Sequence, residues 1–567
     1  MTEPREAADA IVAILAANGV RELFTMPGDA FPVLEAVAKA HAHNEPAPRI
    51  VTCLHETVAL AAAHGHHMVS RVPQACLFHV DVGLQMAGGM LHNAQRARAG
   101  VIVLGGRTPA TWDGALRGGR VIDMHWMQDR GDLGGTVRDY VKWSYDLTRP
   151  EPLGHVIQRA ARIAASDPAG PVYVSLLREM LLEPFAGEIP DAARQQPPRA
   201  CVPEIAALEE VADLINGSER PIAVAGTVGR NPAGFEALER LADVAALPVY
   251  TRGQRANISS EHPMYLGTDH GAALAEADLV LLLDVEVPWT PLFHRLPADA
   301  KVVQLDSDPL KLQMGLWSFP ADISLVGDTA AALPVLADLV EARRTAARAD
   351  QAAEREERIA QAHAAHQASL AEEAGGAANG SPVAVAHLAA CIGELVDDET
   401  IVVDDCTTAL ATTSRHIPIR RPGSYFQPIG SSMGWGAGAA LGAKLAARDA
   451  TVISVNAEGN FLSGAPEAAL WGAARMNAPF LTVVFDNAQY AAIKLGLLHE
   501  YPDSELAKTG TALEIERPPD LVRLAESCGA HGERVESAGD VRDALRRGLE
   551  AVRGGQAALV DVAVKPL

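Results

Sequence analysis

Residues 453–490 read ISVNAEGNFLSGAPEAALWGAARMNAPFLTVVFDNAQY, which predicts a strand, a tight turn, a helix and a second strand. The first strand ends at Asn456, and the second ends in the segment 486–490. In a parallel sheet the carboxyl ends of neighbouring strands meet at one edge, and open α/β folds bind their ligands at that edge. The stretch therefore predicts an α/β domain with a candidate ligand site where its two strands end.

Oxygen-bearing residues stand at both of these strand ends. Glu458 follows the first strand, Asn487 follows the second, and a backbone carbonyl near Gln489 supplies a third oxygen. Mg²⁺ prefers oxygen ligands and keeps coordination positions for phosphate and water. The pattern predicts a magnesium site made by these three residues, although a turn glutamate and a strand-end asparagine are also common as solvated polar residues.

The same alternation of β-branched runs and Ala-rich stretches extends through the chain of 567 residues, which is too long for one hydrophobic core. A Pro-rich segment at 191–203 separates a first series from a second, and a charged, Ala-rich helix separates the second from a third. We therefore expect three consecutive doubly wound parallel-sheet α/β domains. The predicted bounds are 1–185, 200–340 and 383–567, with a linker helix and flexible join at 341–382.

Twelve buried strands are predicted from short runs rich in β-branched residues. They are 50–54, 74–80, 101–106, 171–177, 221–226, 247–251, 277–287, 300–309, 400–405, 450–456, 480–487 and 557–564. No short-period repeat indicates a solenoid.

Composition is that of an ordinary globular protein, with 48% hydrophobic and 21% charged residues. The net charge of −23 makes nucleic acid and an anionic membrane surface unfavourable partners. No apolar run is long enough to span a membrane, and the charged N-terminus lacks a signal-peptide pattern, so we expect a cytoplasmic protein. The six cysteines stand singly, which predicts reduced core residues rather than disulfides or zinc ligands.

Taken together, these segments resemble thiamin-diphosphate enzymes of the acetolactate synthase, benzoylformate decarboxylase and pyruvate decarboxylase type. The stretch from Glu458 to Asn487, 29 positions apart, is similar to the family's diphosphate-binding signature of a Gly-Asp-Gly turn followed by paired asparagines. MPGD (26–29), HETVALAAAHGHHMV (55–69) and GPVYVSLLREML (170–181) resemble parts of the family's first domain. The resemblance implies pyrimidine-binding, middle and diphosphate-binding domains in this order.

Two departures fall within the signature itself. Ala457 and Glu458 stand where the family has Gly-Asp, and Asp486 replaces the first asparagine. Glutamate keeps the carboxylate but adds a methylene group, so the resemblance implies a metal ligand with a shifted reach and an altered affinity. The departures also leave open a decayed cofactor site in a non-catalytic member of the fold.

The resemblance assigns the central role in cofactor activation to Glu56. In this family a glutamate in the His-Glu segment hydrogen-bonds N1′ of the aminopyrimidine and so promotes removal of the C2 proton. A glutamate in the first turn of a helix is otherwise most often a solvated residue. In the family this glutamate meets a cofactor held by the neighbouring subunit, which implies a homodimer or homotetramer.

Further cofactor contacts are implied in the third domain. Met433, in GSSMGWG (430–436), corresponds to the apolar residue that supports the bent cofactor, although core filling would also explain a methionine. Thr407 and Thr408 follow the strand at 400–405, where hydroxyls contact the diphosphate in the benzoylformate decarboxylase type, or they form an ordinary helix cap. Gly459 and Asn460 complete the implied cofactor-binding set.

Four side chains of the first domain could handle substrate protons. The resemblance places His79 at the active-site histidine of the benzoylformate decarboxylase type and Asp29 at a catalytic aspartate of pyruvate decarboxylases. His125 aligns loosely with one of the paired histidines of pyruvate decarboxylases, and Gln128 falls near a glutamine of acetolactate synthases. Each could instead be a satisfied loop or core residue.

The reaction implied is decarboxylation of a 2-oxo acid, its ligation to an aldehyde or ketone acceptor, or both, through a carbanion-enamine intermediate with thiamin diphosphate and Mg²⁺. A 2-hydroxyacyl-CoA lyase uses the same intermediate and stays an alternative. Gly496 stands where acetolactate synthases place a tryptophan, which argues against that exact activity. FAD or ADP in the middle domain is not favoured, because AVAGTVGRN (223–231) is a weak nucleotide signal.

Overall fold

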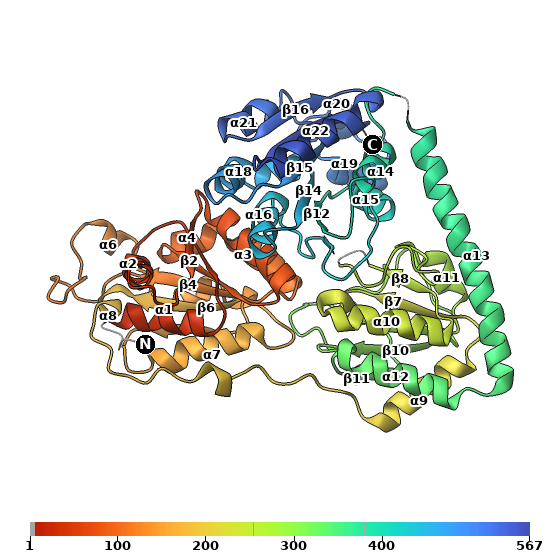
Figure 1. Ribbon diagram of the computed structural model, residues 1–567, viewed down its shortest axis with the longest axis horizontal. Coiled ribbons are helices and arrows are strands. Elements are labelled where there is room, and N and C mark those ends of the chain that lie inside the picture. Colours follow the sequence, from red (N-terminus) through yellow and green to blue (C-terminus); the bar gives the residue numbers. More distant parts are fainter. Residues whose placement is uncertain (1–5, 253–254, 379, 567) are drawn as a thin grey trace. The chain divides into compact units, whose positions relative to one another are not determined.

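The computed structural model describes residues 6–252, 255–378 and 380–566 (Figure 1). These residues form three parallel β-sheets with intervening helices, which confirms the predicted fold class. The chain divides into two compact units. The first comprises Met1–Pro198, Pro428–Arg534 and Arg546–Asp561, and the second comprises Arg199–Gln427, Val535–Leu545 and Val562–Leu567.

The first sheet lies entirely in the first unit. Its strands are β1 (Glu22–Thr25), β2 (Arg49–Thr52), β3 (Gln74–Phe78), β4 (Val101–Arg107), β5 (Ser144–Leu147) and β6 (Val172–Leu177). Their order is β2-β1-β3-β4-β6-β5, and every pair is parallel. The helices are α1 (Ala7–Ala17), α2 (Phe31–Ala42), α3 (Glu56–Ser70), α4 (Val80–Met86), α5 (Gly88–Arg96), α6 (Met124–Met127), α7 (Leu153–Ala165) and α8 (Arg178–Leu181).

The second sheet belongs to the second unit. Its strands are β7 (Pro221–Ala225), β8 (Val249–Thr251), β9 (Leu279–Leu283), β10 (Lys301–Asp306) and β11 (Ile323–Val326), in the order β11-β10-β9-β7-β8. The helices of this part are α9 (Ile205–Gly217), α10 (Pro232–Ala245), α11 (Gly271–Glu276), α12 (Thr329–Arg343) and α13 (Ala346–Gly376). Helix α13 lies within the predicted linker at 341–382 and runs along the outside of this domain (Figure 1).

Helix α13 is fixed to the second sheet's domain by one buried arginine. The Arg355 guanidinium donates to the carbonyl oxygens of Ala245 at 2.7 Å, Ala246 at 2.8 Å and Ser218 at 3.0 Å. These carbonyls lie at the carboxyl ends of α10 and α9, where backbone acceptors lack helical partners. A positive charge at this end of a helix also complements the helix dipole.

The third sheet has the order β13-β12-β14-β15-β17-β16. Its strands are β12 (Thr400–Asp405), β13 (Tyr425–Phe426), β14 (Thr451–Ala457), β15 (Leu481–Asp486), β16 (His531–Val535) and β17 (Ala558–Ala563). The remaining helices are α14 (Val385–Gly393), α15 (Leu410–His416), α16 (Gly436–Ala446), α17 (Glu458–Ser463), α18 (Pro466–Arg475), α19 (Ala491–Glu500), α20 (Glu505–Thr509), α21 (Leu521–Ser527) and α22 (Val541–Arg553).

Within the first unit, α3 packs directly on α16 (Figure 1). The contact is made by small residues, so the two backbones approach closely. A Cβ atom added at Gly442 would lie 1.8 Å from the carbonyl oxygen of Ala62, and one added at Gly65 would lie 2.1 Å from that of Ala439. The Ala- and Gly-rich composition of both helices is therefore required by their packing.

All twelve predicted strands are present, with ends shifted by a few residues. Five strands were not predicted, namely β1, β5, β11, β13 and β16. No helix of the described residues is long and apolar enough to cross a membrane. The cysteines are free, but Cys201 is exposed and Cys528 is half-buried, so the prediction that all six are core residues is wrong for these two.

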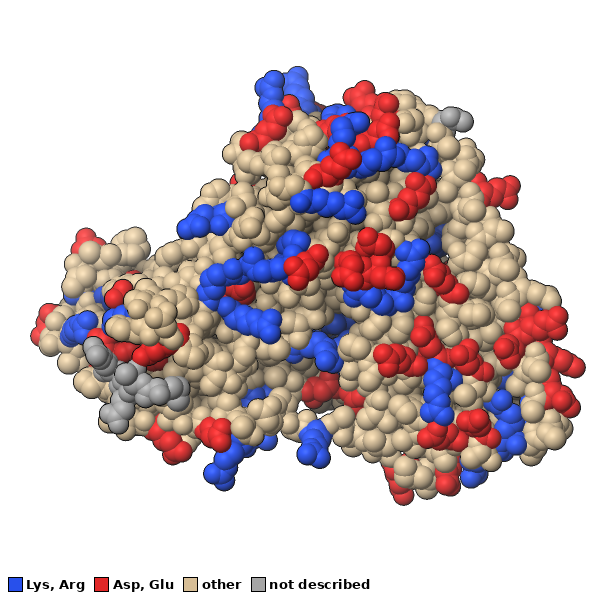
Figure 2. Space-filling view, viewed as in Figure 1, with Lys and Arg blue, Asp and Glu red and all other residues tan. Residues whose placement is uncertain are grey.

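Charged side chains of both signs are interspersed on the face shown in Figure 2. In the second sheet's domain many of them form ion pairs, such as Arg240 with Asp338 and Lys301 with Asp322. Such exposed pairs are worth little individually, so the fold depends mainly on its apolar cores.

Candidate functional site

Glu56 is a buried carboxylate at the start of α3. The Nδ1 atom of His55 caps this helix by accepting from the Thr57 N–H at 3.1 Å, so Glu56 is the first helical residue. It is only 6% exposed, and a Cβ atom added at Gly83 would lie 3.2 Å from its Oε1. Within the described ranges no donor is found for its carboxylate. Glu56 is therefore a largely buried residue whose carboxylate is left available to a ligand.

Glu458 lies at the carboxyl edge of the third sheet. In the β14–β15 register Ala457 is opposite Phe485, so Glu458 and Asp486 leave their strands at the same level. Helix α17 begins at Glu458 itself, so the predicted tight turn over residues 457–460 is wrong. Strand β14 extends to Ala457, and α17 begins at the next residue and continues to Ser463.

The Glu458 carboxylate reaches across to the turn after β15. Oε1 accepts from the Gln489 N–H at 2.9 Å, and Oε2 faces the Asn487 N–H at 3.4 Å. Oδ1 of Asn487 accepts from the same Gln489 N–H at 3.0 Å. The glutamate carboxylate and the asparagine oxygen, both predicted as metal ligands, are therefore brought together around one N–H group.

The surroundings of Glu458 fit a hard cation. Glu458 is 1% exposed. Burial raises the pKa of its carboxyl to about 7, and the negative charge of the nearby Asp486 also raises it. The Oε1 atom of Gln489 is buried without a hydrogen-bond partner. A cation would offset the cost of the buried negative charge and satisfy this oxygen. Among the described residues no cluster of three or more His, Cys, Asp or Glu forms a metal site, so amide oxygens are required.

Asp486 is held by an arginine that the sequence interpretation missed. Arg534, in β16, forms ion pairs with Asp486 and with Asp561 of β17. The other Asp486 oxygen accepts from the Ala488 N–H at 3.1 Å. A cavity of about 670 Å³ is lined by Glu458 and by these three charged residues. The charge added by aspartate at position 486 is therefore balanced inside the fold.

Met433 and Gly459 form an apolar surface beside this edge. A Cβ atom added at Gly459 would lie 3.2 Å from the Tyr490 ring and 3.6 Å from the Met433 Cε. Met433 is 37% exposed, so it is not simply core filling. Asn460 is buried in α17. Tyr490 was not predicted, although its position directly after the asparagine motif was a usable signal.

The loop that carries Met433 is tied to the first domain within the same unit. Asn93 of α5 donates to the Ser432 carbonyl at 2.8 Å and accepts from the Ser432 N–H at 3.1 Å. The Trp435 indole N–H donates to Nδ1 of His64 at 3.0 Å. These contacts fix the loop on both sides of Met433.

Four of the predicted substrate residues converge in the first domain. The Asp29 N–H donates to Nδ1 of His79 at 3.2 Å, and the Gln128 amide donates to the Asp29 carboxylate. Nε2 of His125 lies 3.8 Å from Asp29 Oδ1. Arg178, which the sequence interpretation did not single out, lies between Asp29 and His125, at 3.3 and 3.2 Å. The substrate cluster thus consists of Asp29 and the four residues around it, His79, His125, Gln128 and Arg178.

Thr407 and Thr408 belong to the second unit and lie in the turn between β12 and α15. Thr407 is exposed and Thr408 is half-buried. Ala409 is the N-cap residue of α15, so neither threonine is an ordinary helix cap. Their assignment to a diphosphate stays a prediction.

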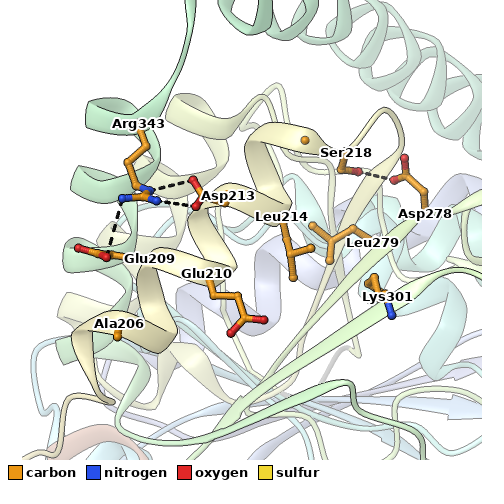
Figure 3. A pocket seen from close by; sticks show the side chains of 11 residues that line it. Ala206, Glu209, Glu210, Asp213, Leu214, Ser218, Asp278, Leu279, Lys301 and Arg343 are labelled. Carbon is orange, nitrogen blue, oxygen red and sulfur yellow. Dashed lines mark hydrogen bonds and ion pairs between the residues drawn. The ribbon is translucent and has the colours of Figure 1, made fainter.

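A second cavity, of about 640 Å³, lies in the second sheet's domain (Figure 3). It is bordered by α9 and by the amino ends of β9 and β10, the edge opposite to the one where α/β sheets bind ligands. Several of its polar groups bind one another: Arg343 forms an ion pair with Asp213, and the Ser218 hydroxyl donates to Asp278. We do not assign this cavity to the site.

The three-sheet architecture is that of thiamin-diphosphate enzymes. The fold superposes on the thiamine diphosphate-dependent 4-hydroxybenzoylformate decarboxylase of Rhodococcus jostii with a TM-score of 0.80 and 21% identity, covering 99% of both chains. The chain belongs to the thiamine pyrophosphate enzyme family. The family's N-terminal TPP-binding, central and C-terminal TPP-binding domains match residues 5–133, 208–336 and 405–562.

Curated relatives match along nearly the full length. Benzoylformate decarboxylase of Pseudomonas aeruginosa is 26% identical, over 95% of this chain and 96% of the relative. A probable acetolactate synthase large subunit of Methanocaldococcus jannaschii is 25% identical, over 99% and 92%. The chain is therefore similar both to a decarboxylase and to a probable acetolactate synthase subunit.

Proposed function

We propose that the chain is a thiamin-diphosphate- and Mg²⁺-dependent enzyme that decarboxylates a 2-oxo acid, ligates it to an aldehyde or ketone, or does both. The observation that carries this proposal is Glu56, a largely buried residue at the start of α3 in the N-terminal TPP-binding domain, whose carboxylate has no donor in the part of the chain that the structure describes. We assign pyrimidine binding to residues 1–185 and diphosphate binding to residues 383–567. Residues 200–340 form the middle domain, and 341–382 join it to the third.

Bound thiamin diphosphate would supply a thiazolium carbon that adds to the substrate carbonyl and takes up the electron pair left by departing CO₂. Glu56 would hold a proton at N1′ of the aminopyrimidine. Met433 would support the cofactor from the apolar side and exclude water, next to Gly459. Asn460 completes the contacts that we assign to α17.

The diphosphate end would be held through the metal. Glu458, Asn487 and Gln489 provide oxygens for Mg²⁺, in agreement with the buried, high-pKa carboxyl of Glu458. Thr407 and Thr408 would offer hydroxyl donors to the diphosphate oxygens. Ala457 and Glu458 then represent a variant of the usual metal site rather than a decayed one, because the longer glutamate side chain reaches the turn after β15.

Substrate protons would be handled by the cluster in the first domain. Asp29 is within hydrogen-bonding distance of Gln128 and Arg178, and its backbone holds His79. These groups can orient a carboxylic or carbonyl substrate and move a proton at the carbon from which CO₂ leaves.

A substrate screen tests the reaction. Holoenzyme is incubated with a panel of aliphatic and aromatic 2-oxo acids, with and without aldehyde acceptors, and CO₂ and ligated products are followed. We expect CO₂ release from at least one acid. Turnover of 2-hydroxyacyl-CoA alone would favour the lyase, and retention of the cofactor without turnover of any donor would indicate a non-catalytic protein.

We further propose that the active form is a homodimer or homotetramer in the cytoplasm. Large apolar side chains are exposed on the first domain, including Met26, Phe31, Leu54, Val82 and Met86, each at least 40% exposed. Where exposed apolar side chains of this size lie together, they are typical of a surface covered by a partner. For the compartment, the free cysteines agree with a reducing environment such as the cytoplasm. Sedimentation velocity should show a dimer or larger, and full activity in a monomeric species would contradict this assembly.

A further inference from the structure

Arg178 connects three separate segments of the first domain. It is the first residue of α8 and is 5% exposed. Its Nε and Nη2 donate to the carbonyl oxygens of Gly118 and Gly119, both at 2.7 Å. Its Nη1 faces Asp29 at 3.3 Å and His125 at 3.2 Å. One buried guanidinium therefore anchors the long segment between β4 and β5 to the loop that carries Asp29.

Both ring nitrogens of His125 face hydrogen-bond donors. The Val121 N–H points at Nδ1 from 3.1 Å, and Nη1 of Arg178 lies 3.2 Å from Nε2. A neutral imidazole can accept at one nitrogen, whereas an imidazolium carries a proton on each and would oppose both donors. The geometry therefore disfavours the charged ring.

The charges around His125 act in the same direction. Burial lowers the pKa of its imidazole, and the charges of Arg178, Arg120 and His79 lower it further, while Asp29 alone opposes them. The surroundings of His125 therefore favour a neutral imidazole. The neighbouring Asp29 carboxylate accepts hydrogen bonds from Gln128 and Arg178.

We propose that Arg178 is a positioning residue that holds a neutral His125 imidazole beside Asp29 and fixes the segment 118–128 to the loop that carries Asp29. This role rests on the proposed function only where activity is measured, since the contacts themselves belong to the folded chain. Four of the five N–H groups of the Arg178 guanidinium face Gly118, Gly119, Asp29 and His125, so its main contacts are with these residues.

The first test measures the positioning without any turnover. Hydrogen–deuterium exchange is followed by mass spectrometry over residues 118–128 in full-length holoenzyme carrying Arg178→Met, Arg178→Lys or the control Arg117→Gln. Arg117 lies in the same segment, is 71% exposed and pairs only with Glu6 among the described residues. Loss of the charged hydrogen bonds should speed exchange about ten- to a hundredfold in Arg178→Met and less in Arg178→Lys, with no change in the control. Exchange equal to wild type in Arg178→Met would overturn the proposal.

The second test is the pH profile of kcat/KM on a substrate found by the screen. If neutral His125 is required, activity is lost as the pH falls through its pKa. Removing the Arg178 charge raises that pKa, so the acid limb should move up by about one pH unit in Arg178→Met. A merely structural role would lower activity at every pH without moving the limb, and that result would refute the claim about His125. Should Arg178→Met fail to fold, Arg178→Lys decides the exchange test, because it loses the fork to Gly118 and Gly119. In the pH profile Arg178→Lys should leave the acid limb in place, because it keeps the charge, and a moved limb would contradict the claim about His125.

Exchange of the C2 proton of bound thiamin diphosphate separates this proposal from the proposed function. Glu56, and not Arg178, controls that step. A wild-type C2 exchange rate with faster backbone exchange in Arg178→Met supports the positioning role. Absence of C2 exchange in the wild type would reject the proposed function, while the exchange at 118–128 would still decide the role of Arg178.

Discussion

Glu56→Gln should slow exchange of the C2 proton of bound thiamin diphosphate by about 10²- to 10⁴-fold while the Kd of the cofactor changes little. Glutamine preserves the length and a hydrogen-bonding group, so it can still occupy the buried position at the start of α3. It cannot share a proton with the aminopyrimidine as a carboxyl group can. The loss therefore falls on proton transfer rather than on binding.

Quenched-flow deuterium exchange measures this step without knowledge of the substrate. Glu35→Gln is the matched control, because Glu35 is an exposed residue of α2 in the same domain. It should exchange at the wild-type rate. A wild-type rate in Glu56→Gln as well would remove Glu56 from the mechanism and with it the main support for an active enzyme.

The architecture was predictable because buried parallel strands are continuous apolar runs that stand out from the Ala-rich helices. Three of the five strands that were missed lack this signature. β5 (Ser144–Leu147) has two exposed residues, β13 is only Tyr425–Phe426, and β16 reads His-Gly-Glu-Arg-Val with one fully buried position. These strands exist because neighbouring strands supply hydrogen-bond partners, which no local pattern records.

Candidate site residues were found where a motif marked them, and their partners were not. Asp29, His79, His125 and Gln128 could be named from resemblance, and the structure places them around Asp29. Arg178 is a lone arginine without a spacing pattern. Its only signal was its position directly after the buried strand β6, at the edge where ligands bind.

Arg534 illustrates a further limit. The replacement of asparagine by Asp486 was visible in the sequence, and an added buried charge requires a counter-charge. Arg534 lies 48 positions away, on an edge strand that was not predicted, and pairs with both Asp486 and Asp561. The need for a cation could therefore be anticipated, whereas its identity depended on the order of strands in the sheet.

Binding of thiamin diphosphate should require a divalent cation and should disappear when EDTA is added. Glu458→Ala should raise the Mg²⁺ concentration needed for half-maximal cofactor binding by about a hundredfold or more, because it removes the only carboxylate among the three assigned ligands. Isothermal titration calorimetry at a series of Mg²⁺ concentrations gives this quantity. Glu467→Gln, an exposed glutamate at the start of α18, is the control and should leave it unchanged.

Glu458→Asp distinguishes a rebuilt metal site from a decayed one. Aspartate restores the usual family residue but shortens the reach by one methylene group, and in this chain the glutamate carboxylate spans the gap to the N–H groups of Asn487 and Gln489. Losing these charged hydrogen bonds should weaken Mg²⁺-dependent binding about tenfold or more, a smaller loss than in Glu458→Ala. Tighter binding in Glu458→Asp would mean that the backbone still fits aspartate and that Glu458 is a relic. Unchanged binding in both variants would show that Glu458 is not a ligand.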